Sequence, residues 1–284
     1  MDAAPPAALG LIAGRGSFPL EIARSARERG LRVAAVAFHG QTDPRLAREA
    51  HQVTWLHPGE IDAAADALIG AGARDAVMVG KVPKTTLYGD RGDLRADARA
   101  VQLMDRLKDR SDASILGTVA EFLASRGIRL LAQTQLVPQL LAEDGPMGAT
   151  RPTPEQLADV RFGFPIAKTV AELDVGQTIV VKNRAVLAVE AIEGTDEAIR
   201  RGGSIGAGAC VVKVAKPNQD PRFDVPTIGV DTVAVLAEAG AALLAFEAGQ
   251  TVVLDRELLV ERADAHGIAL IGVRGGEGDG AVGA

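Results

Sequence analysis

Apolar segments the length of a β-strand alternate with amphipathic stretches through the first half of the chain. Leu9–Ala13 is followed at once by a glycine turn, Gly14-Arg-Gly-Ser-Phe-Pro19, and then by a stretch with helical periodicity. Leu31–Phe38 is the next apolar run, and a helical stretch over 59–71 precedes a third at Ala76–Val79. Strands joined by helices in this way pair in parallel, with helices covering the sheet. The pattern predicts an N-terminal α/β domain with a Rossmann-like parallel sheet.

A change in composition marks the expected boundary between two domains. The segment 143–155 is rich in turn-forming residues and has no apolar period, which is typical of an exposed linker. Beyond it, short strands such as Val211–Val214 mix with helical stretches, for which we take Val233–Phe246 as an example. With 284 residues, the chain has the length of two ordinary domains. We expect a Rossmann-like nucleotide- or phosphate-binding domain over 1–145 and a mixed α/β catalytic domain over 146–284.

Composition and charge exclude several classes of protein. Hydrophobic residues make up 47% of the chain and charged residues 24%, which fits a globular protein. A net charge of −6 and an aromatic content of 3% give nucleic acid neither electrostatic attraction nor stacking platforms, so no nucleic-acid partner is expected. The sequence shows no basic leader and no apolar run near the roughly 18 residues of a membrane span. Together with the single cysteine, Cys210, this predicts a cytoplasmic location.

Two glycine turns follow strands that we expect to end at the same edge of the sheet. Gly14 and Gly16 lie between the first strand and the first helix, where backbone N–H groups can approach a phosphate at the helix N-terminus. Gly80 and Lys81 follow the third strand, and the lysine can neutralise a phosphate. The alternative is that these are tight turns without a ligand.

The first glycine turn departs from the fingerprint of NAD-binding proteins. Pro19 stands where that fingerprint has its third glycine, and the second strand ends in Phe38-His39-Gly40 without an acidic partner for the ribose. An NAD-linked oxidoreductase is therefore disfavoured. The four histidines of the chain also lack the spacing of zinc ligands.

Carboxylates gather in the sequence at the end of an apolar strand in the second half. The stretch Val189-Glu-Ala-Ile-Glu-Gly-Thr-Asp196 contains Glu190, Glu193 and Asp196, together with the hydroxyl of Thr195. Glu190 lies among apolar residues, where an unpaired carboxylate is costly. A solvated strand end is the alternative explanation for Glu193 or Asp196 alone.

A second polar segment, 213–226, is interrupted by three prolines and cannot be helical. Its basic side chains can bind phosphate groups, and its carboxylates can hold a hard cation or orient a water molecule. The residues concerned are Lys213, Asp220, Arg222 and Asp224. An ordinary polar loop is the alternative.

Three polar motifs, taken together, resemble the UDP-2,3-diacylglucosamine pyrophosphatases of lipid A biosynthesis, of the type unrelated to calcineurin-like phosphoesterases. These motifs are Asp174-Val-Gly-Gln177, Ala188–Asp196 and Gln219-Asp-x-Arg-Phe-Asp-x-Pro226. Gly10-Leu-Ile-Ala-Gly-x-Gly-x-x-Pro19 and Val79-Gly-Lys-Val82 look like the first domain of the same family. The resemblance spans nearly the whole chain.

The resemblance implies a cytoplasmic, magnesium-dependent hydrolase that splits UDP-2,3-diacylglucosamine into UMP and 2,3-diacylglucosamine 1-phosphate, which is also called lipid X. It further implies two domains with the lipid between them, a homodimer, and at most a peripheral contact with the inner membrane surface. In this family an aspartate tied to turnover corresponds to Asp224.

The site residues can then be assigned by role. We expect substrate binding by Gly14, Gly16, Gly80, Lys81, Gln177 and Thr195. The expected catalytic residues are Asp224, Asp220, Lys213 and Arg222. We expect Mg²⁺ among Asp224, Glu190, Glu193 and Asp196. The alternative function is a non-catalytic UDP-sugar or nucleotide-binding regulatory module, which needs the glycine turns and not the carboxylates.

Overall fold

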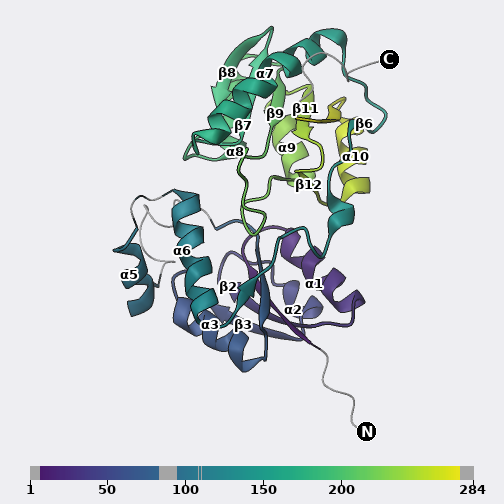
Figure 1. Ribbon diagram of the computed structural model, residues 1–284. Helices are drawn as coiled ribbons and strands as arrows, with labels where there is room; N and C mark the ends of the chain where they lie inside the picture. Colours follow the sequence, from purple (N-terminus) through teal and green to yellow (C-terminus); the bar gives the residue numbers. More distant parts are fainter. Residues whose placement is uncertain (1–6, 83–94, 108, 110, 276–284) are drawn as a thin grey trace. The chain divides into compact units, whose positions relative to one another are not determined.

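The computed structural model describes residues 7–82, 95–107, 109 and 111–275 (Figure 1). The chain forms two compact units. Unit 1 comprises Met1–Pro138 together with Pro221–Asp224, and unit 2 comprises Gln139–Asp220 and Val225–Ala284. The division at Pro138 precedes the boundary expected after residue 145, and a four-residue piece of the expected catalytic loop belongs to the first unit.

Unit 1 contains a five-stranded sheet in the order β3-β2-β1-β4-β5, and every strand pairing in it is parallel. The strands are β1 (Ala8–Ala13), β2 (Arg32–Phe38), β3 (Gln52–Leu56), β4 (Asp75–Val79) and β5 (Arg129–Leu130). The order reverses between β1 and β4, which makes the carboxyl ends of these two strands the topological switch point. The predicted Rossmann-like parallel sheet is confirmed.

Helices cover this sheet because each buries an apolar stripe. The described helices of unit 1 are α1 (Phe18–Glu28), α2 (Leu46–Glu49), α3 (Ile61–Gly70), α5 (Ala98–Met104) and α6 (Asp112–Ser125). Leu68 of α3 and Leu123 of α6 lie in one buried cluster with Ile12 of β1 and Val36 of β2. Pro19 occupies the first turn of α1, where its missing N–H costs no hydrogen bond.

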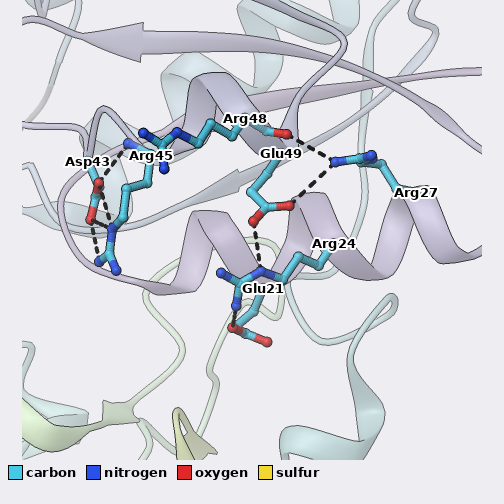
Figure 2. Close-up of polar contacts among 7 residues, drawn as sticks. All are labelled: Glu21, Arg24, Arg27, Asp43, Arg45, Arg48 and Glu49. Atoms are coloured by element: carbon cyan, nitrogen blue, oxygen red, sulfur yellow. Dashed lines mark hydrogen bonds and ion pairs between the residues drawn. The ribbon is translucent and has the colours of Figure 1, made fainter.

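Ion pairs on the surface join α1 to α2 (Figure 2). Glu49 accepts from Arg24 at 3.0 Å and lies 3.5 Å from the guanidinium of Arg27, while Arg24 also pairs with Glu21 at 2.8 Å. Arg27 donates in addition to the carbonyl oxygen of Arg48. Exposed pairs of this kind stabilise a fold only slightly.

Unit 2 is built on a mixed six-stranded sheet in the order β6-β13-β11-β9-β7-β8. Its strands are β6 (Gly145–Met147), β7 (Thr178–Lys182), β8 (Ala185–Val189), β9 (Cys210–Lys213), β11 (Leu243–Glu247) and β13 (Ala269–Val273). The three central strands β9, β11 and β13 are parallel, and the remaining pairings are antiparallel. The short strands β10 (Thr227–Ile228) and β12 (Val252–Val253) pair separately. The predicted mixed α/β fold of the second half is confirmed.

Both faces of this sheet are buried. The helices of unit 2 are α7 (Pro154–Glu172), α8 (Thr195–Ile205), α9 (Val230–Glu238) and α10 (Arg256–Ala265), and a short 3₁₀ helix, η1 (Pro138–Leu140), lies at the junction of the units. Leu244 and Phe246 of β11 pack in the cluster that contains side chains of α8, α9 and α10. Their neighbours Leu243 and Ala245 pack in the cluster that contains α7. Alternate residues of a strand therefore face opposite layers, as the pleat requires.

Two expectations from the sequence are wrong in unit 2. Within the expected linker, β6 is an edge strand paired with β13, a position where Pro146 is tolerated because an edge strand has one unpaired side. The expected helix over Val233–Phe246 ends at Glu238, because the chain reverses at Gly240 (φ 64°) and continues as the buried strand β11.

The only cysteine lies in β9 and is fully buried. Burial, together with the nearby carboxylate of Asp159, raises the pKa of the Cys210 thiol to about 12. The sequence-based view of Cys210 as a small buried thiol is therefore confirmed.

A buried ion pair holds the chain where it leaves the central sheet of unit 2. Glu247, at the carboxyl end of β11, is 7% exposed and accepts from the Lys168 ammonium at 2.9 and 3.1 Å. The N–H of Ala215 donates to Glu247 at 2.8 Å, and the carbonyl of Ala215 accepts from Lys168 at 2.7 Å. The pair thus fixes the backbone N–H and the backbone carbonyl of Ala215, two residues before Pro217.

Replacing Lys168 by Met should therefore lower the thermal unfolding midpoint of the protein. It leaves the Glu247 carboxylate buried without its counterion, which costs about 3 kcal/mol. The double variant Lys168→Met/Glu247→Gln should recover part of this loss, because no charge is then buried. Arg129→Gln, which breaks the exposed pair with Asp75, is the matched control and should leave the midpoint unchanged. Equal losses for Lys168→Met and Arg129→Gln would contradict the prediction.

Candidate functional site

The turns after β1 and β4 meet at the switch point of unit 1. The N–H of Gly14 donates to the carbonyl of Val79 at 2.8 Å, and Arg15 and Lys81 exchange two backbone hydrogen bonds at 2.9 and 3.0 Å. A Cβ on Gly14 would lie 2.7 Å from the carbonyl carbon of Gly80, and a Cβ on Gly80 would lie equally close to that of Gly14. Packing of one backbone against the other therefore accounts for these two glycines.

Packing does not account for Gly16. Its φ is 103°, a conformation that favours glycine, and a Cβ built there would meet no heavy atom within 4 Å. Gly16 precedes Ser17, the N-cap residue of α1, so a ligand can approach the backbone near a positively polarised helix terminus. Lys81 is exposed at the same sheet edge. Of the four predicted substrate-binding residues in the glycine turns, Gly16 thus has open space beside its backbone and Lys81 is exposed.

The segment Pro221–Asp224 is anchored in unit 1. Phe223 is 6% exposed and lies in the same buried cluster as Ile12 and Leu130. The carbonyl of Pro221 accepts from the N–H of Gln133 at 2.7 Å, and the Gln133 amide donates to Met78 in β4 at 2.6 Å. These contacts fasten the segment near the carboxyl ends of β4 and β5.

This anchoring brings Asp224 and Arg222 into the same unit as the glycine turns. Asp224 has φ 59°, a left-handed conformation that aspartate tolerates better than most residues. The Arg222 guanidinium lies 5.5 Å from the centre of the Phe223 ring. Asp220 and Lys213, the other two expected catalytic residues, belong to unit 2. Gln133 and Phe223, which position Asp224, were not among the predicted site residues.

In unit 2, four of the predicted residues form one polar cluster. The Glu190 carboxylate accepts from the hydroxyl of Thr195 at 2.8 Å and from the backbone N–H of Gln177 at 3.2 Å. The Lys213 ammonium lies 3.5 Å from the same hydroxyl. Gly176 allows this arrangement, because a Cβ there would overlap the carbonyl oxygen of Glu190. The carboxylate of Glu190 is half-buried, as its apolar neighbours in the sequence indicate, and hydrogen bonds offset the cost of this burial.

Glu193 has a partner of its own. Glu193 pairs with Arg201 at 2.5 Å. Burial opposes ionisation of Glu193, but hydrogen bonds from its own backbone N–H and from Arg201 outweigh burial and lower its pKa. Asp196 lies in the first turn of α8. The described part of either unit contains no group of three His, Cys, Asp or Glu side chains arranged for a metal ion.

A cavity of about 420 Å³ lies along α5 and α6 and contains none of the predicted site residues. Arginines and apolar side chains line it, among them Arg99, Arg126, Leu103 and Phe122. Arg126 is held by ion pairs with Asp62 and Asp66, and Arg99 lies 3.7 Å from Asp62.

Among the helices that the structure describes, each is too short or too polar to cross a membrane.

Solved structures of other proteins are only weakly similar. The biotin carboxylase domain of a thermophilic 2-oxoglutarate carboxylase is 13% identical with a TM-score of 0.27, and the match covers 61% of this chain and 34% of that one. The structure of gox2253 is 13% identical with a TM-score of 0.32, over 94% of this chain and 77% of that one. Likeness at this level carries no argument about fold or function.

Comparison with sequence families is decisive. The LpxI N-terminal domain matches residues 8–140, and the LpxI C-terminal domain matches residues 143–271. The chain is 31% identical over 277 residues to the UDP-2,3-diacylglucosamine pyrophosphatase LpxI of Caulobacter vibrioides. The match covers 93% of this chain and 97% of that protein. Both halves match in the same order and over nearly their full lengths. The chain therefore belongs to the LpxI family.

Proposed function

We propose that this chain hydrolyses the diphosphate bond of UDP-2,3-diacylglucosamine, giving UMP and 2,3-diacylglucosamine 1-phosphate. Membership of the LpxI family supports this function. The structural observation that carries it is the anchoring of Pro221–Asp224 in unit 1, which puts a carboxylate in the unit that contains Gly16 and Lys81.

The reaction needs charge neutralisation on two phosphates and a positioned water, with little covalent work by the protein. We assign phosphate binding to the Gly16 turn, the start of α1 and Lys81. Asp224 orients the attacking water or holds a cation against the phosphates. We further assign positive charge to Lys213 and Arg222, and substrate contacts to Gln177 and Thr195.

Magnesium dependence is also part of the proposal. The motif 188–196 does not fit a magnesium site on its own, because Glu190 and Glu193 are engaged by hydrogen-bond donors of unit 2. Asp224 fits better, since Mg²⁺ is often held by one or two carboxylates together with substrate phosphates. When bound, the ion would neutralise charge on the diphosphate. The family resemblance further supports a homodimer in the cytoplasm with at most peripheral contact with the inner membrane.

The direct test is incubation of the purified protein with UDP-2,3-diacylglucosamine and Mg²⁺. We expect UMP and the lipid 1-phosphate to appear in equal amounts. Tight binding of intact substrate without release of UMP would contradict hydrolysis and identify a non-catalytic nucleotide-binding module instead.

Asp224→Asn should reduce turnover by about 10² to 10⁴ while leaving the protein folded. Asparagine keeps the shape of the side chain and also tolerates the left-handed backbone, so the charge is the main change. Loss of one negative charge beside a diphosphate also lessens repulsion, so intact substrate should co-purify with the variant and be detected by mass spectrometry. Asp255→Asn is the matched control, because Asp255 has a similar φ of 49° at the start of α10. Near-normal turnover of folded Asp224→Asn would remove Asp224 from the mechanism.

Excess EDTA should abolish hydrolysis, and added Mg²⁺ should restore it, because oxygen ligands and phosphates bind hard cations. A zinc-selective chelator should have little effect. The readout is UMP release at fixed substrate concentration. Full activity in EDTA would show that no exchangeable divalent ion is required.

Gly16→Ala should raise the Michaelis constant about 10-fold, because a Cβ would stand between the backbone and the phosphate. It should also lower the melting temperature, because φ 103° strains an alanine even though the site has open space. Gly72→Ala, at an equally open turn with φ 80° before the start of β4, should lower the melting temperature by a similar amount and leave the Michaelis constant unchanged. Gly14→Ala should instead destabilise unit 1 strongly. Identical kinetics for Gly16→Ala and Gly72→Ala would mean that Gly16 is only a turn residue.

A further inference from the structure

Three aromatic side chains lie together where β2 and β3 end in unit 1. The rings of His39 and His57 have centroids 4.9 Å apart, and His39 lies 5.7 Å from the ring of Trp55. The N–H of His39 donates to the carbonyl of Leu56 at 2.9 Å, which fixes the backbone of the two strand ends relative to each other. His39 is exposed, so one member of the group is open to a flat ligand. None of these residues has a role in the assignment made above.

The group lies at the ligand-binding edge of the sheet. The buried hydroxyl of Thr42 donates to the carbonyl of Ala13 at 2.5 Å and accepts from the N–H of Phe38 at 2.8 Å. Thr42 therefore ties the turn after β2 to the end of β1, directly before the glycine turn. In nucleotide-binding sheets of this kind the end of β2 lies beside the nucleoside. Here that position holds a histidine in place of the acidic residue that binds the ribose of NAD.

Two buried polar atoms at the same strand ends have no hydrogen-bond partner among the described residues. They are the side-chain oxygen of Gln41, which follows β2, and Nδ1 of His57, which follows β3. Buried polar atoms without partners are rare in folded proteins, and an ordered water or a ligand can supply the missing partner. Uracil offers a matching set, because its N3–H can donate to an amide oxygen and its carbonyl oxygens can accept from an imidazole N–H.

We propose that His39, Trp55 and His57 form the subsite for the uracil base of the nucleotide, with Gln41 and His57 contacting its polar edge. This subsite rests on the proposed function, because it assigns part of the same substrate. The base lies against the aromatic group while the phosphates lie at the Gly16 turn, so the sheet edge from β3 to β1 accommodates a uridine phosphate. Stacking of a base on an aromatic side chain contributes about 1 to 3 kcal/mol.

The chain provides its own reporter for this subsite, because Trp55 is its only tryptophan. Titration with UMP should change the intrinsic fluorescence, and calorimetry should give the same dissociation constant. Ribose 5-phosphate, which lacks the base, should bind much more weakly and leave the fluorescence unchanged. CMP should bind more weakly than UMP, because its N3 cannot donate to Gln41. Equal responses to UMP and ribose 5-phosphate would overturn the proposal.

Substitution of His39 tests the uracil subsite independently of the proposed hydrolysis. His39→Ala should weaken UMP binding about 10-fold and leave ribose 5-phosphate binding unchanged. His266→Ala, which removes an exposed histidine at the end of α10, is the matched control and should change neither. UMP binding that depends on His39 in a protein that releases no UMP from substrate would support the subsite and overturn the reaction. Hydrolysis with UMP binding unaffected by His39→Ala would support the reaction and overturn the subsite.

Discussion

Burial of Phe223 in the core of unit 1 decides where Asp224, the carboxylate that we propose to act in the reaction, lies. The surrounding segment belongs in sequence to the second half, yet its aromatic side chain packs with strands and helices of the first. The backbone bond between Gln133 and Pro221 acts together with this packing. Asp224 follows immediately, in a backbone conformation that few residues tolerate, so its direction is fixed by its neighbours on both sides.

The glycine turns illustrate how one sequence pattern can have two physical causes. Gly14 and Gly80 are needed because two backbones approach more closely than a Cβ allows. Gly16, two residues away, lies in open space and is needed for its φ. Only the second situation leaves room for a ligand. Gly14 and Gly80 therefore resemble parts of a phosphate loop because the ends of β1 and β4 pack closely together. This packing restricts movement of the backbone that leads to Gly16.

Strands and helices could be predicted from the sequence where the local hydrophobic pattern matches the burial of the element in the folded protein. Strands β1, β2 and β4 of unit 1 and β9 of unit 2 are continuous apolar runs between turn residues, and these were predicted correctly. Strand β3 was missed, and β11 was taken for the end of a helix. The edge strand β6 was also missed, because its pairing with β13 depends on residues more than 100 positions away. The helix expected over Val233–Phe246 was overextended, because a buried strand and a buried helix of similar composition cannot be separated by periodicity alone.

For the candidate site, residue types were easier to predict than their grouping. The proximity of Gln177, Glu190, Thr195 and Lys213 follows from neighbouring strands, and three of these residues lie within 20 positions of one another. The motif does not reveal that Glu193 pairs with Arg201 or that Asp196 lies in the first turn of α8. The anchoring roles of Gln133 and Phe223 could not be predicted, because a single glutamine or phenylalanine carries no local signal for a contact so distant along the chain.

The path of the chain through residues 221–224 also has a consequence for synthesis and folding. The core of unit 1 includes Phe223, so an emerging polypeptide that ends before this residue lacks one of the side chains that fill it. Unit 1 can begin to fold once its own strands have left the ribosome, but its packing is complete only after β9 of unit 2 has been made. Each unit is compact, but folding of unit 1 depends on a segment encoded within the second half of the gene, so the first half alone does not encode its complete core.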